Sequence, residues 1–366
     1  MALKILQVIN CLATGGAEKL LLETIPLYHK KGIAMDILVL DGTDYPFMKQ
    51  LKELNCCSVY SLGSKSVYNP IAIFKIIPYL RKYDLIHVHL FPAQYFVVFA
   101  KLFVFSKVKL VFTEHNTANR RMINRFFQLF DRFIYAHYHT VICITKEVKL
   151  ILEKHIGSRS NKLVVIENGV NIDTIKDSKT YSKDNIHYGI DKEDKLIIQV
   201  AGFREQKDQP TLIRALSFLP NNYKVLLVGE GIMQNSCEAL TKELQLQKRV
   251  FFLGIRMDVP QLLKTADIVV LSSKYEGLSL SSIEGMASGK PFVASNVPGL
   301  AGIVAGAGIL FELDDSKELA TAIEKLMNNP EYYKSVAEAC QERANQYDIN
   351  SMVDNHIQLY ELINEK

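Results

Sequence analysis

The sequence lacks the patterns of a metal-bound, disulfide-stabilised or exported protein. Its six cysteines have no metal-ligand spacing, and two of them, Cys56 and Cys57, are adjacent. This cysteine usage favours reduced, mostly buried thiols in a cytoplasm. The start of the chain, Met1–Leu6, runs directly into a strand pattern without the cleavage-type ending of a signal peptide. We therefore expect a cytoplasmic protein.

Long hydrophobic runs are also missing. The most apolar stretch, residues 95–105, is interrupted by Lys101 and preceded by Pro92. A helix that spans a bilayer needs about 20 apolar residues, so this stretch is too short. It predicts a buried helix that covers a sheet.

The motifs of several ligand classes are absent as well. A glycine pair, Gly15-Gly16, follows the first predicted strand, but it is not part of a G-x-G-x-x-G pattern, which disfavours a dinucleotide-dependent oxidoreductase. No helix-turn-helix, zinc-finger or aromatic RNA-binding motif occurs, so we expect no nucleic-acid partner. No D-x-D pair lies in a site context, and we expect neither a metal nor a cofactor.

The strand patterns that are present fall into two series, and 366 residues suffice for two domains. Apolar strands separated by helical stretches indicate parallel sheets covered on both faces. The first series is residues 4–9, 35–40, 84–89, 110–113, 140–144 and 163–166, and the second is 195–201, 224–229, 250–253, 267–271 and 291–295. Residues 171–194 have no clear pattern, and residues 350–364 predict a final helix. The chain thus predicts an α/β protein of two Rossmann-like halves joined near Asn168.

Charge is distributed unevenly between the halves. Residues 1–170 carry a net charge of +10 and residues 171–366 a net charge of −6. The segment 120–135 adds a basic, phenylalanine-rich pattern in which Arg121, Arg125 and Arg132 can share one helical face. Such a helix suits an anionic membrane surface, and the alternative is a helix whose phenylalanines pack on the sheet.

The chain is organised around the stretch Ser272–Gly289, which holds two glutamates eight residues apart, Glu276 and Glu284. We expect Glu276 in the loop after a strand and Glu284 in the first turn of the next helix. That edge of an open α/β sheet binds ligands, and a helix start attracts phosphate. The alternative is structural, because Ser281 and Glu284 also fit a capping box.

Other polar or glycine-rich groups follow strands in the same way. His115 lies after one strand, with His87 and His89 at the end of the preceding strand as packed or secondary residues. Each remaining group has a structural alternative, a solvated loop or a tight turn. The remaining groups are Gly15-Gly16, Arg204 with Lys207, Gly229 with Gly231, and Gly254 to Arg256.

Taken in this order, these motifs resemble those of the retaining glycosyltransferases of family 4, above all in the E-x7-E spacing of Glu276 and Glu284. The resemblance implies the GT-B fold, in which two Rossmann-like domains face each other across a cleft and the last helix crosses back to the first domain. It places an acceptor-binding domain at residues 1–169, a domain that binds the nucleotide sugar at 170–349, and the returning helix at 350–366.

The resemblance also implies the roles of the site residues. His115, Glu276, Lys207 and Arg204 would be catalytic, with Arg204 replacing an arginine that the family usually has where this chain has Gly202. The nucleotide sugar would contact Gly15, Gly16, Gly229, Gly231, Arg256, Glu276, Gly277, Leu278, Ser279, Leu280 and Glu284. Near Pro298-Gly299 the chain lacks the glutamate that relatives often carry, so we assign no side chain there.

The activity implied is transfer of a hexose from a nucleotide sugar to a saccharide or lipid-linked acceptor, with retention and without a metal. Such an enzyme would contribute to a surface polysaccharide, working on the inner face of the cytoplasmic membrane. Two alternatives stay open: a nucleotide-sugar isomerase or hydrolase on the same fold, and a non-catalytic protein that binds nucleotide sugars.

Overall fold

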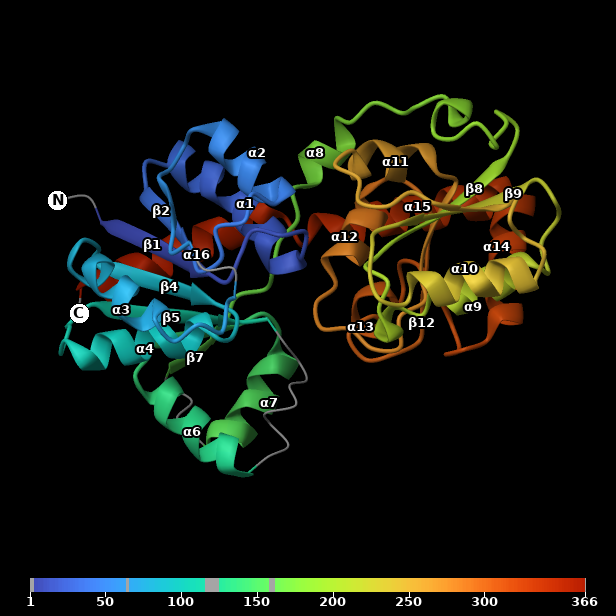
Figure 1. The fold of residues 1–366 in the computed structure, drawn as a ribbon. Helices are drawn as coiled ribbons and strands as arrows, with labels where there is room; N and C mark the ends of the chain where they lie inside the picture. Colours follow the sequence, from blue (N-terminus) through green and yellow to red (C-terminus); the bar gives the residue numbers. More distant parts are fainter. Residues whose placement is uncertain (1–2, 64–65, 116–124, 158–161, 366) are drawn as a thin grey trace. The chain divides into compact units, whose positions relative to one another are not determined.

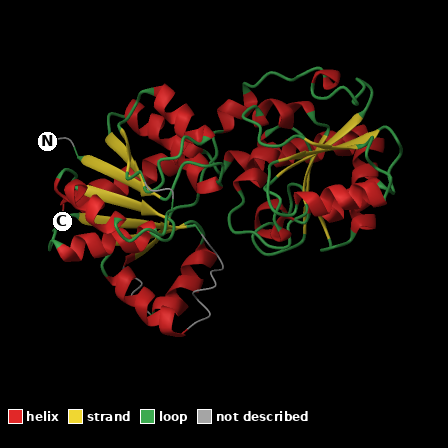
Figure 2. Ribbon diagram, viewed as in Figure 1, coloured by secondary structure: helices red, strands yellow, loops and turns green. Residues whose placement is uncertain are grey.

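The computed structural model describes residues 3–63, 66–115, 125–157 and 162–365 (Figure 1). The chain forms two compact units. Unit 1 comprises residues 1–169 together with 349–366, and unit 2 comprises residues 170–348. Each is a parallel sheet with helices on both sides (Figure 2).

The sheet of unit 1 has seven parallel strands in the order β3-β2-β1-β4-β5-β6-β7. Its strands are β1 (Lys4–Ile9), β2 (Ala34–Val39), β3 (Val59–Ser61), β4 (Leu85–His89), β5 (Lys109–Glu114), β6 (Thr140–Cys143) and β7 (Leu163–Val165). Its helices are α1 (Gly16–Lys30), α2 (Pro46–Leu54), α3 (Ala72–Ile76), η1 (Ile77–Arg81), α4 (Ala93–Phe103), α6 (Arg125–Ala136), α7 (Lys146–Ile156) and α16 (Ile349–Glu365). The central strands are almost fully buried, as their apolar patterns predict.

The final helix belongs to unit 1, as the resemblance implies. Helix α16 packs beside α1, and Tyr28 of α1 and His356 of α16 form a buried hydrogen bond of 2.6 Å between the tyrosine hydroxyl and Nδ1. Further along α16, the Tyr360 hydroxyl lies 2.6 Å from Nδ1 of His87 on β4. These two contacts join residues that are separated by 328 and 273 positions in the sequence, so both ends of unit 1 share one core.

The sheet of unit 2 has six parallel strands in the order β10-β9-β8-β11-β12-β13. These are β8 (Lys195–Val200), β9 (Tyr223–Val228), β10 (Val250–Phe252), β11 (Ile268–Leu271), β12 (Phe292–Ser295) and β13 (Ile309–Phe311). The helices are α8 (Ile172–Lys176), η3 (Lys183–Asn185), η4 (Glu205–Lys207), α9 (Gln209–Leu216), α10 (Gln234–Glu243), α11 (Val259–Thr265), α12 (Leu280–Ala287), α13 (Ala301–Val304), α14 (Ser316–Asn328) and α15 (Pro330–Asn345).

The predicted strands are confirmed, and the structure adds short elements. Strands β3 and β13 have three residues each, too few for a visible alternation in the sequence. Residues 171–194, predicted to have no pattern, contain α8 and η3. The apolar stretch 95–105 lies mainly in α4, which buries Tyr95, Val97 and Val98 as expected of a sheet-covering helix. Within the described ranges, the structure contains no helix with the length and hydropathy of a membrane span.

Strand order determines where a site can lie in each unit. The order reverses between β1 and β4 in unit 1, and between β8 and β11 in unit 2. At such a switch point the loops after the two strands leave in opposite directions and open a crevice at the carboxyl edge of the sheet. In unit 2 these loops carry Lys207 and Glu276.

Close packing of α12 on the sheet gives a first prediction. A Cβ atom on Gly285 would lie 2.7 Å from a ring carbon of Phe292 and 2.8 Å from Cγ1 of Val269. Gly285→Ala should therefore lower the stability of unit 2 by about 1–3 kcal/mol, because overpacking forces the sheet and helix apart. Gly302→Ala is the matched control, because no atom lies within 4 Å of its added Cβ. Thermal unfolding followed by circular dichroism should show a lower Tm for Gly285→Ala alone, and equal Tm values would contradict this packing.

Candidate active site

The carboxyl edge of the unit 2 sheet brings Lys207 and Glu276 together. Lys207 Nζ lies 2.5 Å from Oε1 of Glu276, and the Ser273 hydroxyl donates to the same oxygen over 2.6 Å. The side chains of Lys207 and Glu276 are 19% and 7% exposed. Removing two charges from water is costly unless each is paired, so this arrangement stabilises an ammonium and a carboxylate next to each other. The sequence predicted both charged residues at this edge but not their contact, and it missed Ser273.

Polar side chains, of which Gln199 and Ser272 are buried, connect the two loops of the switch point. Gln199, at the end of β8, donates from Nε2 to the Lys207 carbonyl over 2.8 Å. The Ser272 hydroxyl lies 3.1 Å from Gln199 Oε1 and 2.7 Å from the Asp208 carbonyl. Gln206 Nε2 donates to the Tyr275 carbonyl over 2.8 Å. Our sequence interpretation missed this role of Gln199, although a glutamine inside an apolar strand is the signal that would have found it.

Helix α12 begins earlier than the capping-box alternative requires. Its N-cap is Ser279, whose hydroxyl accepts from the Ser282 backbone N–H over 3.4 Å. The capping box on Ser281 is therefore wrong, and so is the prediction that Glu284 lies in the first turn. Glu284 is the fifth residue of the helix and is buried. The loop Gly277–Ser279 leads into the helix, and Leu280 is its first residue.

The loops after β8 and β9 approach each other closely at two glycines. A Cβ atom on Gly229 would lie 2.4 Å from the Ala201 carbonyl oxygen, and one on Gly231 would lie 2.3 Å from that of Phe203. Gly229 also has a φ of +133°, which L side chains rarely adopt. Both positions therefore require glycine for the loop packing itself, whatever ligand the loops contact.

The two candidate arginines differ in their surroundings. Arg256 forms a bidentate ion pair with Asp258, with distances of 2.7 Å from Nε to Oδ1 and 2.5 Å to Oδ2 from a terminal nitrogen. The hydrogen bond from Arg256 lowers the pKa of Asp258, which also accepts from the Tyr181 hydroxyl. Arg204 is exposed, and its Nε lies 3.9 Å from the position that a Cβ on Gly202 would occupy. The Arg204 guanidinium therefore lies beside the backbone position where the family usually has an arginine.

In unit 1 the predicted glycine loop precedes α1. Gly15 is the N-cap of this helix and Gly16 is its first residue. A Cβ on Gly15 would lie 2.3 Å from a carboxylate oxygen of Glu18, so the Glu18 side chain folds over the loop. Any side chain at Gly15 would have to displace that carboxylate.

His115 follows β5 and is the partly exposed member of a polar cluster. Thr113 and Glu114 face the interior, where the Tyr135 hydroxyl donates to Glu114 over 2.5 Å. His115 Nε2 lies 3.0 Å from Nδ1 of His89. His87 and His89 are buried, which agrees with their interpretation as packed polar groups.

The histidines of this cluster are uncharged. Burial lowers the pKa of His87 and His89 well below the ordinary value, and it lowers the pKa of His115 to about 4. Burial also lowers the pKa of His356, on α16, to about 3. All four are therefore neutral imidazoles near pH 7.

Helix α6 turns aromatic side chains outward, contrary to the alternative in which they pack on the sheet. Phe130 is 38% exposed and Phe133 is 46% exposed, whereas Asp131, Ile134 and Tyr135 are buried. Phe130 contacts Phe99 of α4, and Phe103 of α4 makes an edge contact with Phe74 of α3. We call this surface of Phe74, Phe99, Phe103, Phe130 and Phe133 the aromatic strip. Arg120 and Arg121 lie outside the described residues, as does the side chain of Arg125.

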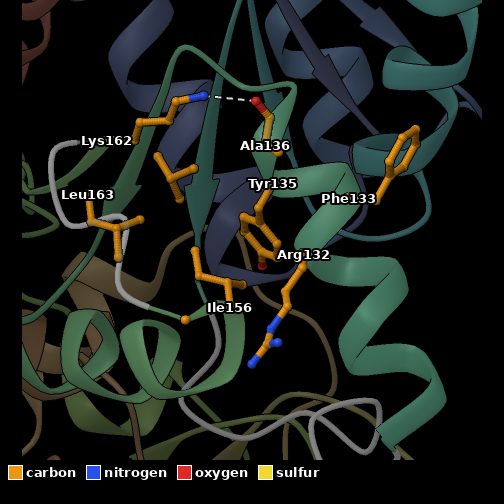
Figure 3. Close-up of a pocket in the computed structure, with 9 residues that line it drawn as sticks. Arg132, Phe133, Tyr135, Ala136, Ile156, Lys162 and Leu163 are labelled. Atoms are coloured by element: carbon orange, nitrogen blue, oxygen red, sulfur yellow. Dashed lines mark hydrogen bonds between the residues drawn. The ribbon is translucent and has the colours of Figure 1, made fainter.

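A pocket of about 470 Å³ lies beside α6 (Figure 3). Lys162 and Arg132 lie at opposite ends of its lining, and Lys162 donates to the carbonyls of Ala136 and Tyr138 over 2.8 and 3.0 Å. None of the predicted site residues lines this pocket. Within the described residues, no three His, Cys, Asp or Glu side chains are grouped as metal ligands would be.

Two family models match the chain. Residues 14–174 match "Glycosyltransferase Family 4" and residues 182–343 match "Glycosyl transferases group 1". A Campylobacter jejuni relative, named N-acetylgalactosamine-N,N'-diacetylbacillosaminyl-diphospho-undecaprenol 4-alpha-N-acetylgalactosaminyltransferase, is 25% identical over 93% of this chain and 94% of its own. An Escherichia coli relative, named UDP-Gal:alpha-D-GlcNAc-diphosphoundecaprenol alpha-1,3-galactosyltransferase, is 25% identical over 81% of this chain and 79% of its own.

The fold matches solved structures over the full length. Anabaena HepE, solved with UDP and glucose, superposes with a TM-score of 0.85 and 23% identity, covering 100% of each chain. This likeness places the two parallel sheets and the returning helix in the GT-B fold.

The neutral histidines predict that acid destabilises unit 1 selectively. An unfolded histidine has a pKa of about 6.5, so below that pH the unfolded state binds more protons than the folded state does. Stability present above pH 6.5 is therefore lost as pH falls toward 4, by up to about 1.4 kcal/mol per pH unit for each buried histidine. Amide hydrogen exchange at pH 7 and pH 5, corrected for intrinsic rates, should show greater loss of protection in β1 and β4 than in β8 and β9.

Unit 2 is the internal control. The chain has nine histidines, and only one of them, His187, lies in unit 2. His356→Gln removes one of the buried histidines, so unit 1 should lose less protection between pH 7 and pH 5 in this variant. Equal losses of protection in both units would contradict the assignment.

Proposed function

Because the chain belongs to the group 1 glycosyltransferases of family 4, we propose that it transfers a hexose from a nucleoside-diphosphate sugar to a hydroxyl of a lipid-linked saccharide, with retention. The observation that carries the proposal is the Lys207–Glu276–Ser273 arrangement at the switch point of the unit 2 sheet. The lipid-linked acceptor is supported by the undecaprenol-linked substrates in the names of both relatives. UDP is supported as the nucleotide by the HepE complex and the UDP-Gal of the Escherichia coli relative.

Lys207 has hydrogen-bond donors to spare for a diphosphate. An ammonium group has three donors, and within the part of the chain that the structure describes, one of them is bonded, to Glu276. The others can bind oxygens of the leaving group, together with the Arg204 guanidinium and the backbone N–H groups at the start of α12, near Ser279 and Leu280. These positive groups would stabilise the charge that develops on the diphosphate, which is the role that a metal has in other transferases.

Glu276 has one carboxylate oxygen available for the sugar. Within the described part of the chain, the bonds from Lys207 and Ser273 both end on Oε1. Oε2 can accept from donor-sugar hydroxyls. Glu284 would accept from the ribose hydroxyls, while Gly229, Gly231 and Arg256 would border the nucleotide, with Arg256 held by Asp258. Gly15, Gly16 and His115 would contact the donor sugar and the acceptor from unit 1.

The chemical step needs no protein nucleophile. The bond from the anomeric carbon to the diphosphate oxygen breaks, and the acceptor oxygen bonds to that carbon on the same face. The acceptor proton passes to the leaving diphosphate oxygen, which acts as the base. Lys207 and Arg204 assist by stabilising the nucleoside diphosphate that departs.

A screen of nucleotide sugars with a lipid-linked saccharide acceptor tests the function. We expect a UDP-hexose or UDP-N-acetylhexosamine to be consumed only when the acceptor is present, with retained configuration and unchanged rate in EDTA. Donor consumption without acceptor would favour the isomerase or hydrolase alternative. Binding without turnover would favour the non-catalytic one, and loss of activity in EDTA restored by Mg²⁺ would overturn the metal-free mechanism.

Glu284→Ala should weaken UDP binding in calorimetric titration by about tenfold or more, because hydrogen bonds to a charged group contribute about 1.5–3 kcal/mol. Glu331→Ala, at an exposed carboxylate of the same unit, should leave the affinity unchanged. An unchanged affinity together with a lower Tm for Glu284→Ala would assign that residue a structural role only.

We also propose that unit 1 binds an anionic membrane through the aromatic strip and the basic segment 120–132. Exposed phenylalanines can enter the lipid interface, and each basic side chain near an anionic leaflet contributes about 1 kcal/mol. The net charge of +10 on residues 1–170 directs this half toward such a surface. This location suits a cytoplasmic enzyme whose acceptor is anchored in the bilayer.

Vesicle co-sedimentation tests the membrane proposal. The Phe103→Ser, Phe133→Ser double variant should bind anionic vesicles at least tenfold more weakly, since a buried phenylalanine contributes about 1.5–3 kcal/mol. The Arg121→Glu, Arg125→Glu double variant should lose the part of its binding to anionic vesicles that salt weakens. Phe218→Ser removes a comparably exposed phenylalanine of unit 2 and serves as the control. Equal binding by all four proteins, or equal binding to neutral and anionic vesicles, would overturn the proposal.

A further inference from the structure

A buried chain of hydrogen bonds connects Gln7 of β1 to His115 after β5. Gln7 Oε1 lies 2.8 Å from Nε2 of His89, and Nδ1 of His89 lies 3.0 Å from Nε2 of His115. Gln7 is 1% exposed and His89 is 3% exposed. No water molecule can easily replace either partner at such burial, so the polarity of each bond is determined by the side chains themselves.

The amide of Gln7 determines the first bond. Its Nε2 lies 3.3 Å from Sδ of Met35 on β2. A thioether sulfur is a weak acceptor, so the NH₂ end of the amide faces it in preference to the carbonyl end. The amide oxygen therefore faces His89. Because an amide oxygen only accepts, Nε2 of His89 must carry the proton of that bond.

Because both imidazoles are neutral, the tautomer of His89 determines the tautomer of His115. Burial holds both imidazoles neutral near pH 7, so each carries one N–H proton. His89 has its proton on Nε2, and its Nδ1 can therefore only accept. His115 must donate from Nε2 to that nitrogen, which leaves Nδ1 of His115 unprotonated and able to accept.

We propose that Gln7 and His89 are positioning residues that hold His115 as a hydrogen-bond acceptor at Nδ1, so that His115 binds a hydroxyl group of the substrate and not an oxygen of the diphosphate. An ionised phosphate oxygen has no proton to donate, whereas every free hydroxyl of a sugar has one. The inference rests on the proposed function only for the identity of that hydroxyl, as part of a hexose.

Heteronuclear NMR of the full chain with ¹⁵N-labelled histidine reads the tautomers directly. Two-bond proton–nitrogen correlations distinguish a protonated ring nitrogen from a bare one, and His89→Gln and His115→Asn assign the two signals. We expect both rings in the Nε2–H form between pH 6 and pH 8. An Nδ1–H form at His115, or an Nε2 without its proton at His89, would overturn the proposal.

Two variants of Gln7 with similar volume separate polarity from packing. Gln7→Glu should draw a second proton onto His89, whose Nδ1–H would then donate to His115 and shift His115 to the Nδ1–H form. Gln7→Met removes the acceptor and should leave both rings in a mixture of tautomers. A His115 tautomer unchanged in both variants would show that Gln7 does not determine it.

Ligand titration distinguishes this inference from the proposed function. The Nδ1 signal of His115 should shift with the UDP-sugar that the donor screen identifies and not with UDP alone, and kcat/KM for that donor should fall about tenfold in Gln7→Glu. If the screen finds no donor, the proposed function fails while the tautomer result stands. An identical shift with UDP alone would overturn the assignment of His115 to a hydroxyl.

Discussion

In both units all strands run in one direction, and this constraint determines where polar chemistry can occur. Parallel strands that are buried on both faces have apolar interiors, so polar side chains concentrate at their carboxyl ends. Lys207, Ser273 and Glu276 meet there in unit 2, and His89 and His115 meet there in unit 1. Each cluster comes from loops that are distant in sequence and adjacent at the sheet edge.

Buried polar residues one layer below these edges keep the clusters in position. Gln199 and Ser272 join the loops after β8 and β11, and Gln7 meets His89 between β1 and β4. A buried amide without partners would destabilise the fold, whereas a fully bonded one specifies a single arrangement. The same side chains thus contribute to the core and to the geometry of the candidate site.

The sequence predicted the elements that have a strong periodic signal. The long apolar strands, α4, α16 and the two-unit architecture followed from pattern and length, and the candidate site residues followed from their positions after strands. The three-residue strands β3 and β13 escaped prediction, because so few residues show no alternation. The start of α12 was misplaced, since Ser279 and Ser281 are equally good caps in sequence and only the backbone distinguishes them.

Contacts between distant residues could not be read from the sequence. The pair Lys207–Glu276 spans 69 positions, and Asp258 and Tyr181 had no motif to identify them. The outward orientation of Phe130 and Phe133 depends on which face of α6 is buried against the rest of unit 1. The buried face includes Asp131, a carboxylate bonded to His155 over 2.7 Å, and a sequence pattern places such a residue in solvent.

The return of α16 to unit 1 imposes an order on synthesis. A ribosome releases residues 1–169 long before Tyr360, so His87 and Tyr28 lack their partners on α16 until unit 2 has been made. Unit 2 is continuous in sequence and can complete its core while the first sheet is still without α16. During that interval the apolar faces of α1 and β4 need protection from other chains. A helix made after unit 2 thus completes the core of unit 1, and a chain interrupted before α16 lacks the partners of His87 and Tyr28.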